Sequence, residues 1–226
     1  MKKETVLHVL NGQCMYDYFQ KIGFKQRGKV IPFNEAMCVG EVTEDIFSDE
    51  FFEKRCLAHH VTLEDYKNVT INKLMCLIKH EFSKIVLWFD DDMFCQINLL
   101  TILGYLDQIS FRGEVVFNLV NNHFQKVEEL QINPQGYYEI YKSVMIKKIM
   151  PNNVGISSLT RGIQLYLDLQ KKDNEIIRYI EKHKDVEPQK LVLDLISTFP
   201  QYGLGDIQYT ELIKIFSGYE RGNQNG

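Results

Sequence analysis

Three consecutive carboxylates, Asp90, Asp91 and Asp92, follow a strongly apolar run and are the residues of this chain best placed to do chemistry. Carboxylates at the end of a buried strand can bind Mg²⁺ or act as a general base. Acidic residues in the first turn of a helix also offset the helix dipole, and one of them can simply be the N-cap. The sequence leaves both interpretations open, and Asp92 is the one of the three acids best suited to a further role.

Five further residues are candidates for the same ligand site: Asn11, Gly12, Glu35, Arg55 and Gln96. Gly12 permits a tight turn and a close approach of the backbone to a ligand. Gln96 stands among mostly apolar neighbours and must find a partner or face a pocket. Helix N-termini and one arginine suit a phosphorylated or nucleotide-like ligand, although three aspartates repel an anion unless a cation intervenes. No residue is assigned a catalytic role, and whether the protein is an enzyme stays open.

Common cofactor and catalytic motifs are missing from the chain. It has no G-x-G-x-x-G, no P-loop, no H-E-x-x-H and no G-x-S-x-G sequence. His59 and His60 are adjacent, and neighbouring residues point in different directions on a regular element, so we expect no zinc site there and assign no residue as a metal ligand. His8 lies inside a strand-like run, where a core histidine is the commoner role. The sequence identifies no cofactor.

The composition is that of a globular protein. Of 226 residues, 45% are hydrophobic and 25% charged, and the net charge of −4 gives no positive field to attract nucleic acid or anionic lipid. The five cysteines are widely spaced and form no C-x-x-C pair, which favours reduced thiols. No apolar stretch approaches the roughly 20 residues of a membrane span, and no signal-peptide core is evident. We expect a cytoplasmic protein.

Strand-like runs alternate with helical patterns in the first part of the chain. The runs lie at residues 5–10, 29–33, 84–89 and 114–120. This alternation predicts a Rossmann-like α/β fold, a mostly parallel sheet with flanking helices. Ligands bind such sheets outside the carboxyl ends of the strands. We therefore predict that Asn11, Arg55, Asp92 and Gln96 line one concavity at that edge.

Two elements of this part carry definite expectations. The run at 84–89 is the clearest strand, and we place it in the interior of the sheet with Val86 buried. The helix predicted for about 93–109 is apolar nearly all round, which is typical of a helix buried on most sides. Leu99, Leu100 and Leu103 should therefore be core residues.

After about residue 122 the pattern becomes helical. We predict an α/β sheet domain over 1–124 and a helical C-terminal region over 125–226 packed on it, with a frayed tail at 222–226. Helices near 188–199 and 206–217, with a turn between them, have helix-turn-helix spacing. From residue 187 to 226, however, five acidic residues face three basic ones, so we do not expect nucleic-acid binding.

Several strings resemble a known bacterial family. They lie at residues 7–12, 32–40, 54–55, 86–100 and 199–205, and the most specific is the string from Val86 to Leu100. Together they are similar to the uncharacterised family called domain of unknown function eighteen thirty-five. The family has no established activity, so the resemblance implies no particular reaction. Its members usually have Asn-Gly-Asp-Ser where this chain has Asn11, Gly12, Gln13 and Cys14.

Two functions of different classes follow. The first is a pocket for a small phosphorylated or nucleotide-like ligand at the carboxyl ends of the strands. The second is a non-catalytic regulatory or protein-interaction role in which the C-terminal helices form the contact surface. The oligomeric state is not predicted.

Overall fold

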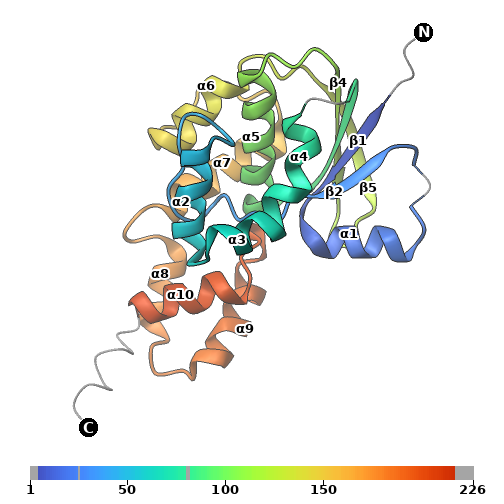
Figure 1. Ribbon diagram of the computed structural model, residues 1–226. Coiled ribbons are helices and arrows are strands. Elements are labelled where there is room, and N and C mark those ends of the chain that lie inside the picture. Colours follow the sequence, from blue (N-terminus) through green and yellow to red (C-terminus); the bar gives the residue numbers. More distant parts are fainter. Residues whose placement is uncertain (1–4, 25, 80–81, 217–226) are drawn as a thin grey trace.

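The computed structural model describes residues 5–24, 26–79 and 82–216 (Figure 1). Its centre is a five-stranded sheet in the order β2-β1-β3-β4-β5. The strands are β1 (Val6–Leu10), β2 (Lys29–Pro32), β3 (Lys84–Asp90), β4 (Glu114–Val120) and β5 (Lys126–Ile132).

The sheet is mostly parallel, which confirms the predicted α/β class. The strands β2, β1, β3 and β4 all run in one direction, and β5 alone pairs antiparallel, on β4. As predicted, β3 lies in the interior, between β1 and β4, and Val86 is buried. Its apolar and β-branched residues suit a strand that is covered on both faces.

The edge strand β5 contradicts the expectation that the chain is helical after residue 122. Its sequence, KVEELQI, is mostly polar and largely exposed, so it carries no hydrophobic pattern of the kind that marks the other strands. Main-chain pairing to β4 holds it in place, and charged side chains are common on edge strands. The sheet thus continues past residue 124.

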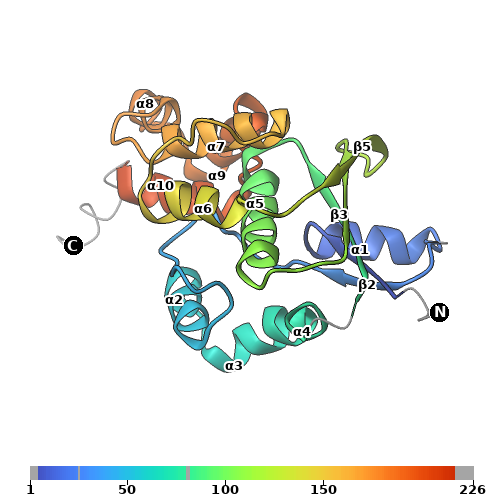
Figure 2. The same cartoon turned by 90° about the horizontal axis from the view of Figure 1, so that it is seen from above.

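The two faces of the sheet are covered unequally (Figure 2). On one face lies α1 (Gly12–Lys21), whose Met15 and Phe19 pack on Trp88 and its neighbours. The other face carries α4 (Asn72–Ile78) and α5 (Met93–Gln108), with α2 (Asp49–His59) and α3 (Leu63–Tyr66) beyond them. A π-helical segment, Lys67–Ile71, joins α3 to α4.

The helix α5 is the centre of the larger core. As predicted, Leu99, Leu100 and Leu103 are fully buried. The sheet covers one side of α5, and α6 (Tyr137–Tyr141) and α7 (Ser157–Leu169) pack on the other. Gly104 allows α6 to approach, because a Cβ there would lie 2.9 Å from the Cβ of Tyr141.

The rest of the C-terminal region is helical, as predicted. After the π-helical segment Lys142–Ile146 and α7 come α8 (Glu175–Lys182), α9 (Pro188–Thr198), a 3-10 turn (Pro200–Tyr202) and α10 (Asp206–Phe216). Among the described residues, no helix is long and apolar enough to span a membrane. The tail predicted to be frayed, 222–226, lies outside the described residues, as do Glu220 and Arg221 of the charge count.

Candidate functional site

A buried ion pair lies beside the carboxyl ends of β1 and β2. Glu35 follows β2, and Arg55 projects from α2, so the pair joins the sheet edge to that helix. The Nη2 atom of Arg55 donates to Oε1 of Glu35 at 2.9 Å, and both side chains are buried. Arg55 also donates to the carbonyl oxygens of Ala36, Val39 and Glu41, which fixes the loop between β2 and α2.

The carboxylate of Glu35 has three other partners. It accepts a hydrogen bond from the backbone N–H of Ala36 at 2.8 Å and another from the hydroxyl of Tyr66. Nε2 of His59 lies 2.5 Å from the same carboxylate. Burial alone would raise the pKa of Glu35, but the charge of Arg55 and the hydrogen bonds from His59 and Arg55 lower it to about 2. Glu35 is therefore a buried, fully ionised carboxylate.

Asn98 of α5 connects this ion pair to the end of β1. Its Nδ2 donates to the backbone oxygen of Glu35 at 2.8 Å and to Oδ1 of Asn11 at 3.0 Å. Its Oδ1 accepts from the backbone N–H of Met37 at 3.0 Å. Asn11 in turn donates to Sγ of Cys95 at 2.8 Å. The polar network thus runs from α2 to the first turn of α5.

Asp92 ends this network as the N-cap of α5. Its Oδ1 accepts from the backbone N–H of Cys95 at 2.7 Å, and its Oδ2 accepts from the thiol of the same residue at 3.2 Å. Burial raises the pKa of Asp92. Gly203, between the 3-10 turn and α10, covers the carboxylate so closely that a Cβ would lie 2.4 Å from it. Capping is the role that these contacts give Asp92.

Gln96 lies outside the network. Its Nε2 donates to the backbone oxygen of Asp90 at 2.5 Å, and its Oε1 is buried without a partner among the described residues. It faces α7 where Gly162 leaves room for it, because a Cβ at Gly162 would come within 2.4 Å of the Cβ of Gln96.

A cavity of about 760 Å³ opens at the same sheet edge. Three of the six candidates predicted from sequence line it, namely Asn11, Gly12 and Glu35. Arg55, Asp92 and Gln96 are not among its lining residues. The expected common concavity is therefore wrong for Arg55, Asp92 and Gln96, although hydrogen bonds connect Arg55 and Asp92 to Asn11. Other lining residues come from the loop that follows β2 and from the segment from α3 to α4: Phe33, Asn34, Tyr66, Val69, Thr70 and Lys73.

Several residues of the site were not among the candidates predicted from the sequence, His59 and Asn98 among them. His59 lines the cavity and contacts Glu35, and it lies one helical turn after Arg55, a spacing that places both on one face of α2. Asn98 is a fully buried amide two positions after Gln96, and the argument that singled out Gln96 applies to it equally.

Comparison with protein-family models, with curated proteins and with solved structures finds no match for this chain.

Proposed function

We propose that the chain binds a small phosphorylated or nucleotide-like ligand in the 760 Å³ cavity at the carboxyl ends of β1 and β2. The observation that carries the proposal is the N-terminus of α1, which lies in the wall of this cavity. Gly12 and Gln13, the first residues of the helix, both line it. This volume is within the range of about 300–1,000 Å³ that is usual for small-molecule sites.

The start of α1 is suited to an anion. Its N-cap residue, Asn11, makes no capping hydrogen bond to the helix, because its side chain is bound to Asn98 and Cys95 instead. The first N–H groups of a helix lack partners within the helix, and the dipole favours a negative charge there. A glycine at the first position, with φ of +83°, lets a ligand approach the backbone closely.

The remaining walls fit the other parts of such a ligand. Lys73 supplies a positive charge at the cavity and forms no ion pair within the described part of the chain. The charge of Glu35 is already balanced by Arg55, and Asp65 accepts a hydrogen bond from the hydroxyl of Thr62. The apolar side chains Phe33, Val69 and Phe94 can cover a ribose or base.

A thermal-shift series tests this proposal. Inorganic phosphate, ribose 5-phosphate and AMP are added to the wild type, to Lys73→Ala and to Lys184→Ala, an exposed lysine away from the cavity. We expect a ligand-dependent rise in Tm for the wild type and for Lys184→Ala, and a severalfold weaker affinity for Lys73→Ala. Absence of any shift, or equal shifts in all three proteins, would contradict the proposal.

Membership of the domain of unknown function eighteen thirty-five is part of the same proposal and rests on the strings at 86–100 and 199–205. The second string includes Gly203, whose contact with Asp92 gives a reason for glycine there. A cytoplasmic location is also proposed, because the five cysteines are free, as expected in a reducing compartment.

A second candidate, protein contact through the C-terminal helices, is favoured by apolar side chains that α9 and α10 leave exposed. Leu193, Ile207 and Ile215 are each about two-thirds exposed. Sedimentation velocity over a concentration series tests self-association on this surface. Concentration-dependent growth that Leu193→Glu abolishes would support it, and a monomer at every concentration would argue against a second copy as the partner.

A further inference from the structure

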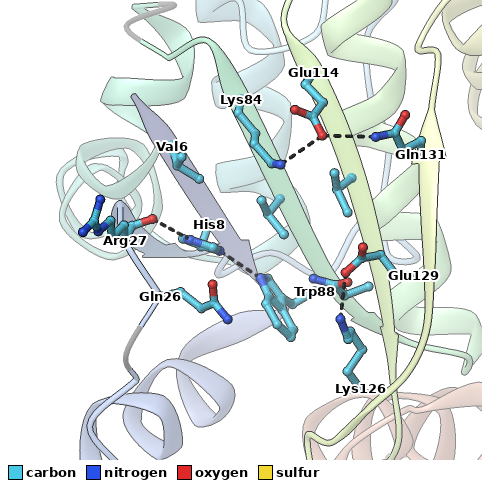
Figure 3. Close-up of a pocket in the computed structure, with 13 residues that line it drawn as sticks. Val6, His8, Gln26, Arg27, Lys84, Trp88, Glu114, Lys126, Glu129 and Gln131 are labelled. Atoms are coloured by element: carbon cyan, nitrogen blue, oxygen red, sulfur yellow. Dashed lines mark hydrogen bonds and ion pairs between the residues drawn. The ribbon is translucent and has the colours of Figure 1, made fainter. Parts of the chain in front are cut away.

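The sheet face that carries α1 is only partly covered. The helix packs over the ends of the strands, and beyond it a cavity of about 570 Å³ opens over β1, β3, β4 and β5 (Figure 3). The parallel register places side chains in rows across this face: His8, Val86 and Val116 form one row, and Trp88 and Asn118 belong to the next. These side chains form the floor of the cavity.

His8 has no free polar atom on this floor. The indole Nε1 of Trp88 can only donate, and it lies 3.2 Å from Nδ1 of His8, so Nδ1 is the acceptor (Figure 3). Nε2 therefore carries the proton and donates to the backbone oxygen of Arg27 at 3.2 Å. The imidazole is neutral, and burial lowers its pKa. Its ring adds to the aromatic and apolar surface.

The charges at the rim are largely paired with one another. Lys84 and Glu114 form an ion pair at 2.9 Å, and Nε2 of Gln131 also donates to Glu114 (Figure 3). Lys126 and Glu129 form another at 2.7 Å. Because these charged side chains already pair with one another, the site suits an uncharged ligand.

Asn118 is the polar group on the floor that lacks a partner. It is 2% exposed, it lines the cavity, and its Oδ1 forms no hydrogen bond within the described residues. Buried polar atoms are nearly always hydrogen-bonded, so an unpaired one needs an explanation. A side-chain amide presents an acceptor and two donors next to each other.

We propose that this cavity is a second ligand site and binds an uncharged nucleobase-like ring whose edge pairs with the amide of Asn118. The valines, Trp88 and His8 contact the flat apolar faces of the ring. Oδ1 of Asn118 accepts from an exocyclic amine and Nδ2 donates to the neighbouring ring nitrogen, the two-bond pattern by which asparagine recognises adenine. The site is separate from the cavity at the carboxyl ends of β1 and β2, and it does not rest on the function proposed for that cavity.

Trp88 provides a direct readout, since it is the only tryptophan in the chain and lines this cavity. Adenosine is titrated into the protein, and tryptophan fluorescence is followed. Purine riboside, which lacks the exocyclic amine, is the matched probe. We expect saturable fluorescence change with adenosine and binding at least about tenfold weaker for purine riboside, because the missing amine leaves Oδ1 unpaired.

Variants locate the site. Asn118→Leu should weaken adenosine binding by about tenfold or more, whereas Asn152→Leu, the same change in an exposed loop, should leave it unchanged. Three results would overturn the proposal: no fluorescence response to millimolar adenosine, equal affinity for the two nucleosides, or wild-type affinity in a folded Asn118→Leu protein. The comparison of the two nucleosides uses wild-type protein and decides the matter even if the variant does not fold.

Discussion

Removal of the Glu35 carboxylate tests the energetic account of the polar network. Glu35→Gln keeps the shape of the side chain and removes its charge, which leaves the fully buried Arg55 without an anionic partner, next to backbone carbonyls and Nε2 of His59. Breaking a buried ion pair by removal of one partner costs about 3–5 kcal/mol. The pKa of Glu35 gives a similar figure, because a fall from 4.5 to about 2 corresponds to about 3 kcal/mol.

The pH dependence provides a second measure of the same quantity. The folded pKa of Glu35 lies below the unfolded value of 4.5, so its contribution is complete above pH 4.5 and is lost as the pH falls towards 2. Urea unfolding of the wild type should therefore show a falling free energy of unfolding across this window. Glu35→Gln should be less stable at neutral pH and should lack this part of the decline.

A double-mutant cycle separates the ion pair from packing effects. Arg55→Met leaves Glu35 with Tyr66, His59 and the N–H of Ala36, and the double variant removes both charges. We expect the double variant to lose less stability than the two single losses combined, by about 1.5 kcal/mol or more. A Glu35→Gln loss below about 1 kcal/mol with an unchanged pH profile would refute the reasoning.

Three further predictions concern the core, the contact of Gly203 with Asp92 and the sheet face that carries α1. Leu100→Ala should cost about 2–5 kcal/mol in denaturant melts, and a loss below about 1 kcal/mol would show that α5 is less tightly packed than its burial indicates. Gly203→Ala should lower Tm more than Gly136→Ala does. Both glycines have positive φ, but only a Cβ at Gly203 meets the carboxyl group of Asp92, so equal losses would count against that contact. The imidazole of His8, whose pKa burial lowers, should show no NMR titration midpoint at 6.5. Its contribution to stability is complete above that pH and declines as the pH falls below it, and an ordinary midpoint would contradict the buried tautomer.

Local pattern predicted most of the sheet because its strands are buried. After Lys84 the run at 84–89 is apolar on both sides, the pattern of a strand that is buried on both faces, and residues 85–89 are all buried. By contrast, β5 is an edge strand that is held by backbone hydrogen bonds to β4. Its side chains are mostly exposed, so they show no hydrophobic pattern. A strand of this kind has no hydrophobic signature for sequence analysis to find.

The site was predicted only in part. The rule for parallel sheets located the correct edge, where Asn11, Gly12 and Glu35 now line the cavity. The rule does not say which polar residues face outward and which pair with each other. Arg55 forms an ion pair with Glu35 and donates hydrogen bonds to backbone carbonyls. Asp92 caps its own helix. The Glu35–Arg55 pair joins residues 20 positions apart, so spacing alone could not reveal it, whereas capping by Asp92 is local and was one of the two interpretations that the sequence left open.

The strand order has a consequence for synthesis of the chain. The centre of the sheet joins β1 to β3, but the chain first makes α1 and β2, which lies on the other side of β1. Until Lys84–Asp90 has left the ribosome, one edge of β1 has no native partner. Pairing between strands far apart in the sequence forms slowly, and an unpaired strand edge can pair with other chains. The edge of β1 that pairs with β3 therefore stays open to other partners while the 73 residues between the two strands are made.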